Sequence, residues 1–500
     1  MTSGRTVLAL TVLLTLVSCT TAIAQSGDAA ASVRRAARAM DEGRFDEAAN
    51  IYRNLLKGSP DEPGLLMNLG MALAMGGLEA EALAPLERAL TLNPELLPAR
   101  LFLGSSHLAL GQPEKAIAPL ERVVAARPKE VEHRRMLAQA YAAVGRRPDA
   151  VTELRKITEL APRLPAAWFA LGHAYNALTQ DAMSTFDDQP EDSPWRRVLV
   201  ADALAADGRH TDAFAIYRAT LERLPSMVSI HDSVARIYEQ TGHADWAARE
   251  RAAAASLAIN CVKRKALCEF RAGRYRSALT AALAGNDVES RYWRARAATE
   301  LALAAFKRLD TLPDSRERRE VRASLARAER RYTDAVADLK AALVFAPGDP
   351  GLLDDLGTTY YFAREFEQAV AMLSPLLEAN PDDARLLTVY GDSLLQLNRV
   401  DEALPTLRRA VERGSSDPMP RLILGRAYLQ KGDFAAAIPL LEPQLAGDHD
   451  GSLHVQLARA YTGLGERDKA AALLAQSQEI QRAAQARDAA TGQRTITAPK

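Results

Sequence analysis

The stretch LMNLGMALAMGGLEAEALAPLERALTLNP (66–94) is followed by RLFLGSSHLALGQPEKAIAPLERVVAARP (100–128), which matches it without a gap at an offset of 34 residues. A third copy, RRMLAQAYAAVGRRPDAVTELRKITELAP, occupies 134–162. Helix-forming residues dominate the chain, and no run of alternating β-branched residues suggests a sheet. The period therefore predicts an array of helical units, each of which buries its apolar face against its neighbours.

Certain residue types recur at fixed positions in each copy and predict how its two helices meet. A Leu-Gly pair in the first helix marks the place where the second helix approaches closely. Gly111, Gly145 and Gly208 are predicted to form the turn between the helices, where glycine tolerates the backbone geometry. An alanine in the second helix, such as Ala82, is small enough to let the helices touch, and a closing proline stops that helix.

The copy that begins at 165 carries the most complete pattern. In WFALGHAY (168–175), Trp168, Leu171, Gly172 and Tyr175 have the spacing W-x2-L-G-x2-Y. This pattern, repeated every 34 residues, resembles the tetratricopeptide repeat. The resemblance covers 29–482 and implies an all-α fold, an α-solenoid of about 14 helix-turn-helix units that form a right-handed superhelix with a concave groove.

Irregularities in the repeat predict the boundaries between the parts of the chain. We expect an N-terminal array over 25–255, an irregular basic helical segment over 256–315, a C-terminal array over 316–486 and a disordered polar tail over 487–500. The predicted units begin near residues 29, 63, 97, 131, 165, 194, 228, 316, 350, 384, 418 and 451. The strings 177–193 and 298–315 resemble each other and are predicted to be shortened or fused helix pairs that bend the superhelix.

The first 24 residues have the features of a secretion signal: one positive charge at Arg5, a short uncharged apolar run, and small residues after it. Leu16-Val17-Ser18-Cys19 resembles the lipobox of bacterial lipoproteins, which implies lipidation of Cys19 and an outer-membrane protein that faces the periplasm. Ala22-Ile23-Ala24 also fits ordinary signal cleavage, which would leave a soluble periplasmic or secreted chain that begins at Gln25. In either case the protein is predicted to be exported, and where Cys19 is lipidated its membrane contact is through the lipid anchor only.

Cys261 and Cys268 are the two cysteines outside the signal, and two interpretations of them remain open. In an oxidising periplasm they can form a disulfide. Seven residues along one helix separate the Cα atoms by about 10.5 Å, too far for a disulfide, so Cys261 would have to precede the helix, with Asn260 as its N-cap. Otherwise the two thiols are buried and reduced.

The family resemblance implies a groove lined by first-helix positions that do not face the core, with a protein or peptide partner bound in it. Alignment assigns these positions to Phe102, Met136, Phe169, His173, Asp202, Arg236, Asp354, Thr358, Tyr361, Asp392, Arg426 and Arg459. Exposed aromatic and Arg side chains are typical anchors of a binding surface. The alternative for each residue is that it packs between helices.

A basic segment stands out in a chain whose formal net charge is zero. From Val262 to Arg331 there are 18 Lys or Arg and 9 Asp or Glu residues, a local balance of 18 − 9 = +9. Its candidate basic surface consists of Lys263, Arg264, Lys265, Arg271, Arg274 and Arg276. One interpretation is a binding surface for an anionic polysaccharide or lipid head groups. The other is a solvated helical face with internal ion pairs.

The sequence contains no motif for catalysis, cofactor binding or metal binding. It has no G-x-S-x-G, no Gly-rich phosphate loop and no H-E-x-x-H, and its eight histidines are scattered. We therefore expect no cofactor, no resident metal and no enzymatic activity. Export disfavours nucleic acid as a partner. The hypothesis is a non-catalytic protein–protein interaction scaffold in the bacterial cell envelope; the alternative is an accessory lipoprotein for envelope or exopolysaccharide assembly or export, which binds an anionic polymer.

Overall fold

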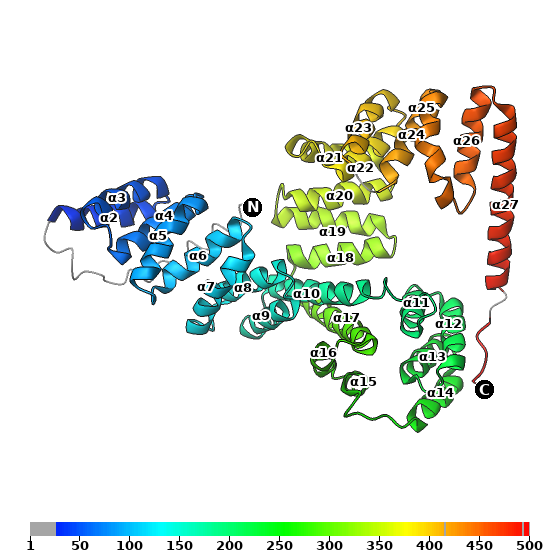
Figure 1. Ribbon diagram of the computed structural model, residues 1–500, viewed down its shortest axis with the longest axis horizontal. Coiled ribbons are helices and arrows are strands. Elements are labelled where there is room, and N and C mark those ends of the chain that lie inside the picture. Colours follow the sequence, from blue (N-terminus) through cyan, green and yellow to red (C-terminus); the bar gives the residue numbers. More distant parts are fainter. Residues whose placement is uncertain (1–26, 415–416, 493–494, 500) are drawn as a thin grey trace. The chain divides into compact units, whose positions relative to one another are not determined.

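The computed structural model describes residues 27–414, 417–492 and 495–499, and within these ranges the chain forms helices and turns without a strand (Figure 1). The predicted signal cleavage and the lipidation of Cys19 lie outside the described residues. The all-α fold that the sequence predicts is thus confirmed for the part of the chain that the structure describes.

The first helices of the chain follow the predicted 34-residue spacing closely. They are α2 (Gly27–Asp41), α3 (Phe45–Gly58), α4 (Pro63–Met75), α5 (Glu79–Leu92), α6 (Leu97–Ala109), α7 (Pro113–Ala126), α8 (Val131–Ala143) and α9 (Arg147–Leu160). Each even-numbered helix packs on the odd-numbered helix that follows it, which makes one unit.

The middle of the chain is less regular, because two of its helices are much longer than a normal unit allows. Its helices are α10 (Pro165–Ser184), α11 (Pro194–Ala206), α12 (His210–Arg223), α13 (Val228–Gln240), α14 (Ala244–Ser256), α15 (Lys265–Arg271), α16 (Tyr275–Leu283) and α17 (Val288–Asp310). Instead of shortened or fused pairs, α10 and α17 are single helices of 20 and 23 residues. Neither has a glycine that would reverse the chain at the usual position. The hydroxyl oxygens of Thr179 in α10 and Thr299 in α17 lie 3.3 Å apart.

Regular pairs return after α17 and continue toward the C-terminus. They are α18 (Arg316–Ala328), α19 (Tyr332–Phe345), α20 (Pro350–Phe362), α21 (Phe366–Ala379), α22 (Ala384–Gln396), α23 (Val400–Glu412), α24 (Met419–Lys431), α25 (Phe434–Leu441), the 3-10 helix η1 (Glu442–Gly447), α26 (Ser452–Gly463) and α27 (Arg467–Gly492). Helix α27 extends beyond the predicted boundary at 486. The prediction of a disordered tail therefore does not hold for the helical residues up to Gly492.

The structure confirms how the two helices of a unit were predicted to meet. A Cβ atom added to Gly104 would lie 2.7 Å from Cγ of Leu120 in the second helix, so only glycine allows this approach. Gly111 has a φ of +68°, in the left-handed region that glycine adopts readily. Ala82 is fully buried in the second helix of its unit. The recurring small residues are therefore requirements of helix packing and chain reversal.

The chain divides into two compact parts, each of which contains several repeat units. One consists of the described residues up to Asp181 together with Ala298–Ala305, and the other of Ala182–Ala297 together with the described residues from Phe306 onward. Within each part, the first helices of neighbouring pairs also touch one another. For example, α4 touches α6, and α20 touches α22. Consecutive second helices make fewer contacts with one another. These runs of pairs therefore curve toward their first helices, and we call the side that those helices line the inner face.

Candidate functional site

The predicted groove residues lie on first helices, but they differ in how accessible they are. Phe102, Met136 and Asp392 are buried; Phe169, Asp202, Asp354, Thr358, Tyr361 and Arg426 are half-buried; His173, Arg236 and Arg459 are exposed. The structure therefore separates residues that hold the fold together from residues that a partner can reach.

Phe102 and Met136 are not groove residues, and this part of the prediction is wrong. Their side chains are 2% and 4% exposed. Phe102 belongs to a buried cluster with Leu86 of the preceding unit, and Met136 belongs to one with Leu120. Both side chains pack against the second helix of the unit before them. On an α-helix, a shift of one position turns a side chain by about 100°, enough to take it from the inner face to the interface between units.

In the N-terminal part, two of the remaining candidates come close together on one helix. Phe169 and His173 lie one turn apart on α10, and their ring centroids are 4.3 Å apart in a tilted arrangement. They form a small aromatic surface. Arg236 lies on α13 and is exposed.

The C-terminal candidates form a connected set across successive first helices. The Tyr361 hydroxyl on α20 donates a hydrogen bond of 2.5 Å to the carboxylate of Asp392 on α22, and the Gln396 amide donates to the other carboxylate oxygen at 3.2 Å. Burial and the neighbouring Asp392 carboxylate raise the pKa of Tyr361, so this tyrosine stays a hydrogen-bond donor throughout the physiological range. Asp392 is 5% exposed and is held entirely within the protein.

Further polar contacts extend this set along the inner face. Arg385 on α22 forms an ion pair with Asp354 on α20. Arg426 on α24 donates to the Gln456 side chain on α26 at 3.3 Å. Each contact joins the first helices of adjacent units. We call Asp354, Tyr361, Arg385, Asp392, Arg426 and Arg459 the C-terminal inner surface; among them, Arg459 is exposed and Arg426 is half-buried, so their guanidinium groups can donate to a partner.

An aromatic group borders the C-terminal inner surface at the end of α20. Phe362 is 52% exposed and stacks on Tyr332, with ring centroids 6.0 Å apart. Its ring also meets Tyr361 edge-on at 5.3 Å. Exposed aromatic rings and arginines are typical of the residues that anchor protein partners. Phe362 is not among the groove residues that the sequence predicts, although it directly follows the candidate Tyr361.

Asp202 is engaged by the chain itself and is not available to a partner. The hydroxyl of Tyr217 donates to one carboxylate oxygen, and Tyr292 and Arg296 of α17 donate to the other at 3.0 and 2.6 Å. Burial raises the pKa of Tyr217 and of Tyr292. No sequence signal connects Asp202 with residues about ninety positions later, which is why the sequence could not predict this cluster.

Half of the candidate basic surface is neutralised by carboxylates of its own chain. Three ion pairs join it to carboxylates: Arg264 to Glu289 (2.6 Å), Arg271 to Asp232 (2.9 Å) and Arg274 to Glu269 (2.6 Å). Elsewhere in the basic segment, Arg319 pairs with both Asp314 and Asp338. Lys263, Lys265 and Arg276 are exposed. These contacts favour a helical face with internal ion pairs over a dedicated site for an anionic polymer.

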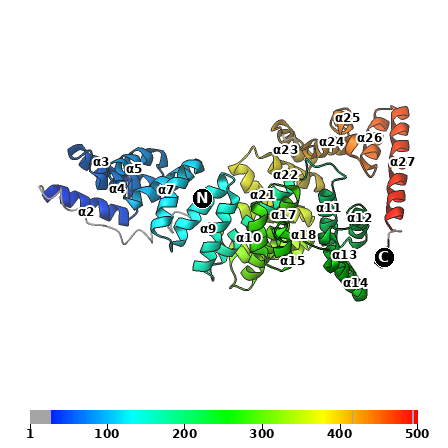
Figure 2. The same cartoon turned by 60° about the horizontal axis from the view of Figure 1, so that its bottom comes forward.

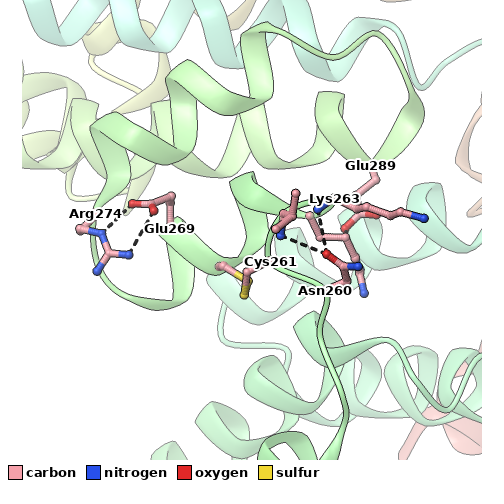
Figure 3. Close-up of a disulfide and its surroundings, with 9 residues drawn as sticks. Asn260, Cys261, Lys263, Glu269, Arg274 and Glu289 are labelled. Atoms are coloured by element: carbon pink, nitrogen blue, oxygen red, sulfur yellow. Dashed lines mark hydrogen bonds and ion pairs between the residues drawn. A yellow bond between two sulfur atoms is a disulfide. The ribbon is translucent and has the colours of Figure 1, made fainter.

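The sulfur atoms of Cys261 and Cys268 are bonded, and their Cα atoms lie 5.7 Å apart (Figure 3). Cys261 lies in a turn ahead of α15, which is the arrangement that the sequence required for a disulfide. Asn260 is not the cap of that helix, because the helix begins later. Its side-chain oxygen instead accepts hydrogen bonds of 3.1 Å from the backbone amides two and three residues ahead and closes the turn.

The described residues contain neither a metal-binding cluster nor a membrane-spanning helix. No group of three or more His, Cys, Asp or Glu side chains there has an arrangement that could hold a metal ion. In the same ranges, no helix combines the length and the apolar character needed to cross a membrane.

Comparison with known families gives a consistent result. Three models of the tetratricopeptide repeat match the chain, one over 33–96 and 355–418, one over 77–140 and 107–174, and one over 422–454. The matches agree with the pairs α2–α9 and α20–α26. No curated protein matches the chain.

Solved structures also resemble parts of the chain. MamA from Desulfovibrio magneticus RS-1 is 24% identical over 31% of this chain and 87% of its own, with a TM-score of 0.30. MamA AMB-1 is 19% identical over 32% of this chain and 94% of its own, with a TM-score of 0.29. These alignments are short and distant, and they add no argument about function.

Proposed function

Because the chain is a tetratricopeptide-repeat protein, we propose that it works as a non-catalytic scaffold of the bacterial cell envelope that holds a segment of a partner protein on the C-terminal inner surface. Arrays of this repeat bind proteins through the long surface that their first helices line. The chain is accordingly a protein–protein interaction scaffold, and the specific surface, the partner and the envelope location are the proposal.

One observation carries the choice of surface: Arg426, Arg459 and Phe362 are accessible beside a rigid polar set. The hydrogen bond from Tyr361 to buried Asp392 joins α20, which carries Phe362, to α22. The hydrogen bond from Arg426 to Gln456 joins α24 to α26, which carries Arg459. Preorganised side chains lose little conformational entropy when a partner binds, so more of the contact energy remains as affinity. The N-terminal candidates, by comparison, comprise two residues on α10 and an isolated Arg236.

Photo-crosslinking tests the surface. We would place p-benzoylphenylalanine at Phe362, irradiate cells and look for a discrete protein adduct. The matched control carries the same crosslinker at exposed Gln368 on the second helix α21. The proposal expects an adduct from position 362 that is absent from 368 and weakened by Arg426→Ala with Arg459→Ala. Equal adducts from both positions, or none from 362, would reject this surface.

The envelope location is supported by the lipobox-like Leu16–Cys19 stretch and agrees with a disulfide, since disulfides persist in oxidising compartments. The intact mass of the mature N-terminus tests it. An acylated Cys19 establishes an anchored lipoprotein, and a chain that begins at Gln25 establishes a soluble exported protein. An uncleaved Met1 would contradict export.

A further inference from the structure

The residues near the C-terminus lie against a helix far earlier in the sequence. In both views the segment 495–499, with the sequence TITAP, lies beside α13 (Figures 1 and 2). The Tyr238 hydroxyl donates a hydrogen bond of 2.6 Å to the carbonyl oxygen of Thr497. Ile496 packs against the buried apolar cluster that contains Tyr238. No sequence pattern indicates this contact, because the tail consists mostly of small and polar residues.

Tyr238, which donates the hydrogen bond to the segment, belongs to a group of aromatic side chains. The Trp246 ring on α14 meets the Tyr238 ring edge-on, with centroids 5.6 Å apart, and Phe214 lies at the same distance from Tyr238 on its own helix. His243, in the turn before α14, stacks on Trp246 at 4.1 Å. Trp246 and His243 are half-buried, so their rings remain partly accessible. We call these four residues the aromatic platform.

The residues of the segment differ in how exposed they are. Ile496 and Pro499 are half-buried, whereas Thr495, Thr497 and Ala498 are exposed. The segment belongs to no helix or strand. In a polyproline II conformation, residues three apart lie on the same side, which is the spacing of the two half-buried positions. Extended segments with proline commonly dock on aromatic surfaces, and a side-chain donor to a backbone carbonyl fixes their position.

From these contacts we propose that the aromatic platform is a peptide-binding site for an extended segment of the type Ile-x-x-Pro, and that its resident occupant is the C-terminal segment of this chain. The site lies on α12 to α14, on other helices than the C-terminal inner surface, so it goes beyond the proposed function and does not rest on it. A partner with such a segment has to displace the tail, which acts at the high effective concentration of a tethered ligand.

Binding of a free peptide tests the proposal. The probe is fluorescein-labelled QRTITAPK, which corresponds to 493–500. It is titrated by fluorescence anisotropy into the full chain and into a chain that ends at Gly492. We expect saturable binding to the shortened chain and binding at least about tenfold weaker to the full chain, where the tail competes. No binding to the shortened chain, or equal binding to both, overturns the proposal.

A second variant keeps the test valid if truncation disturbs the fold. Ile496→Asp in the full chain places a charge where the tail meets the apolar cluster, and it should free the platform so that the unmodified peptide binds as it does to the shortened chain. The same substitution in the peptide should abolish binding. A full-length Ile496→Asp chain that still excludes the peptide contradicts the proposal.

The hydrogen bond is tested separately within the shortened chain. Tyr238→Phe keeps the ring and removes the donor, which should weaken peptide binding about 2- to 12-fold. The matched control is Tyr428→Phe, the same chemical change at a tyrosine whose hydroxyl contacts Arg408 on α23; it should leave the affinity unchanged. Equal affinities in the two variants overturn the assignment of Tyr238. None of these variants touches Phe362, Arg426 or Arg459, so failure here leaves the crosslinking result independent.

Discussion

The regular pairs α20–α23 and the middle helices α11–α17 are held together in different ways. In the regular pairs a first helix meets the second helix of its own unit through a glycine and a buried leucine sixteen residues later, as Gly391 meets Leu407. In the middle, Asp202 on α11 binds Arg296 on α17, across a large separation in sequence. The regular contacts are apolar and local, while the middle contact is charged and distant.

This difference has an energetic consequence. Local apolar contacts add up unit by unit, so the loss of one weakens its own pair and the neighbouring interfaces. A buried charge is more sensitive to the loss of a single contact. Burial has removed its hydration, and only its charged partner compensates for that loss. The middle of the chain therefore depends on a few residues, whereas the regular pairs distribute their stability over many.

The largest effect is expected from Asp202→Ala. This change leaves the Arg296 guanidinium, 15% exposed, without its carboxylate, together with the hydroxyls of two buried tyrosines. Removal of one partner from a buried ion pair costs about 3–5 kcal/mol. We expect hydrogen exchange in α11–α13 and at the start of α17 to rise strongly while α20–α23 stay protected.

The control for this experiment is Arg399→Ala, which removes one partner of an exposed pair with Glu402 in a regular unit. Exposed pairs contribute little, so its exchange pattern should match that of the native chain. If Asp202→Ala left exchange in α11–α13 unchanged, the buried pair would not be what holds the middle together.

A smaller loss is expected from Gly391→Ala in the regular region. The added Cβ atom would lie 2.7 Å from Cγ and Cδ2 of the fully buried Leu407. Overpacking of this kind costs about 1–3 kcal/mol. The matched control is Gly447→Ala, where nothing lies within 4 Å of the new atom. Urea denaturation should show a lower midpoint for Gly391→Ala than for the native chain, and an unchanged midpoint for Gly447→Ala. Equal midpoints for the two variants would mean that the two helices move apart at little cost in free energy.

The sequence predicts the regular region almost completely because the contacts there are local. Gly111 at the turn and Leu120 beside Gly104 can be read from a single 34-residue unit. Accessibility was harder to predict. Phe102 and Tyr361 both occupy first helices, and only the actual rotation of each helix shows that Phe102 is buried while Tyr361 lies on the inner face.

The middle region could not be predicted to the same depth, since its important contacts join distant segments. Nothing in the neighbourhood of Asp202 in the sequence indicates Tyr292 or Arg296 as partners, and nothing in the polar tail indicates Tyr238. The repeat pattern states which residues build a unit. It does not indicate which segments, distant in sequence, contact one another in the folded chain.

The middle region should also depend on pH in a way that the regular pairs do not. Both ring nitrogens of His231 face acceptors: Nδ1 is 2.6 Å from the carboxylate of Glu250, and Nε2 is 3.0 Å from the Pro225 carbonyl oxygen. The hydrogen bond to Glu250 raises the pKa of His231 above its ordinary value. Only the protonated ring can donate to both acceptors.

The direction of the pH effect follows from this raised pKa. Its stabilisation is fully present below the unfolded-state pKa of about 6.5 and is lost as the pH rises through the higher folded-state value. The melting temperature should therefore fall with rising pH across this window, less steeply in His231→Gln. The loss is expected to be smaller than that of Gly391→Ala, because Arg218 also lies 4.0 Å from Glu250. Parallel curves for the two proteins would show that His231 does not respond.

The smallest effect is a gain, and it is expected in the regular region. Arg364 has a φ of +63° at the turn between α20 and α21, and Gly432 occupies the corresponding turn two units later with a φ of +83°. The left-handed conformation costs a residue with a Cβ atom about 1–2 kcal/mol of stability, and a change to glycine removes this cost. Part of the gain is lost again, because glycine has more conformational freedom in the unfolded chain.

Arg364→Gly should therefore stabilise the regular pairs by about 0.5–1 kcal/mol, measured as a higher urea midpoint. The reciprocal change, Gly432→Arg, should lower the midpoint by a similar amount. It replaces glycine by arginine at an equivalent turn, whereas Arg364→Gly replaces arginine by glycine. A loss of stability in both variants would mean that the arginine side chain contributes contacts that outweigh its backbone strain. The regular pairs would then resemble the middle region, where a single charged side chain decides whether neighbouring helices stay together.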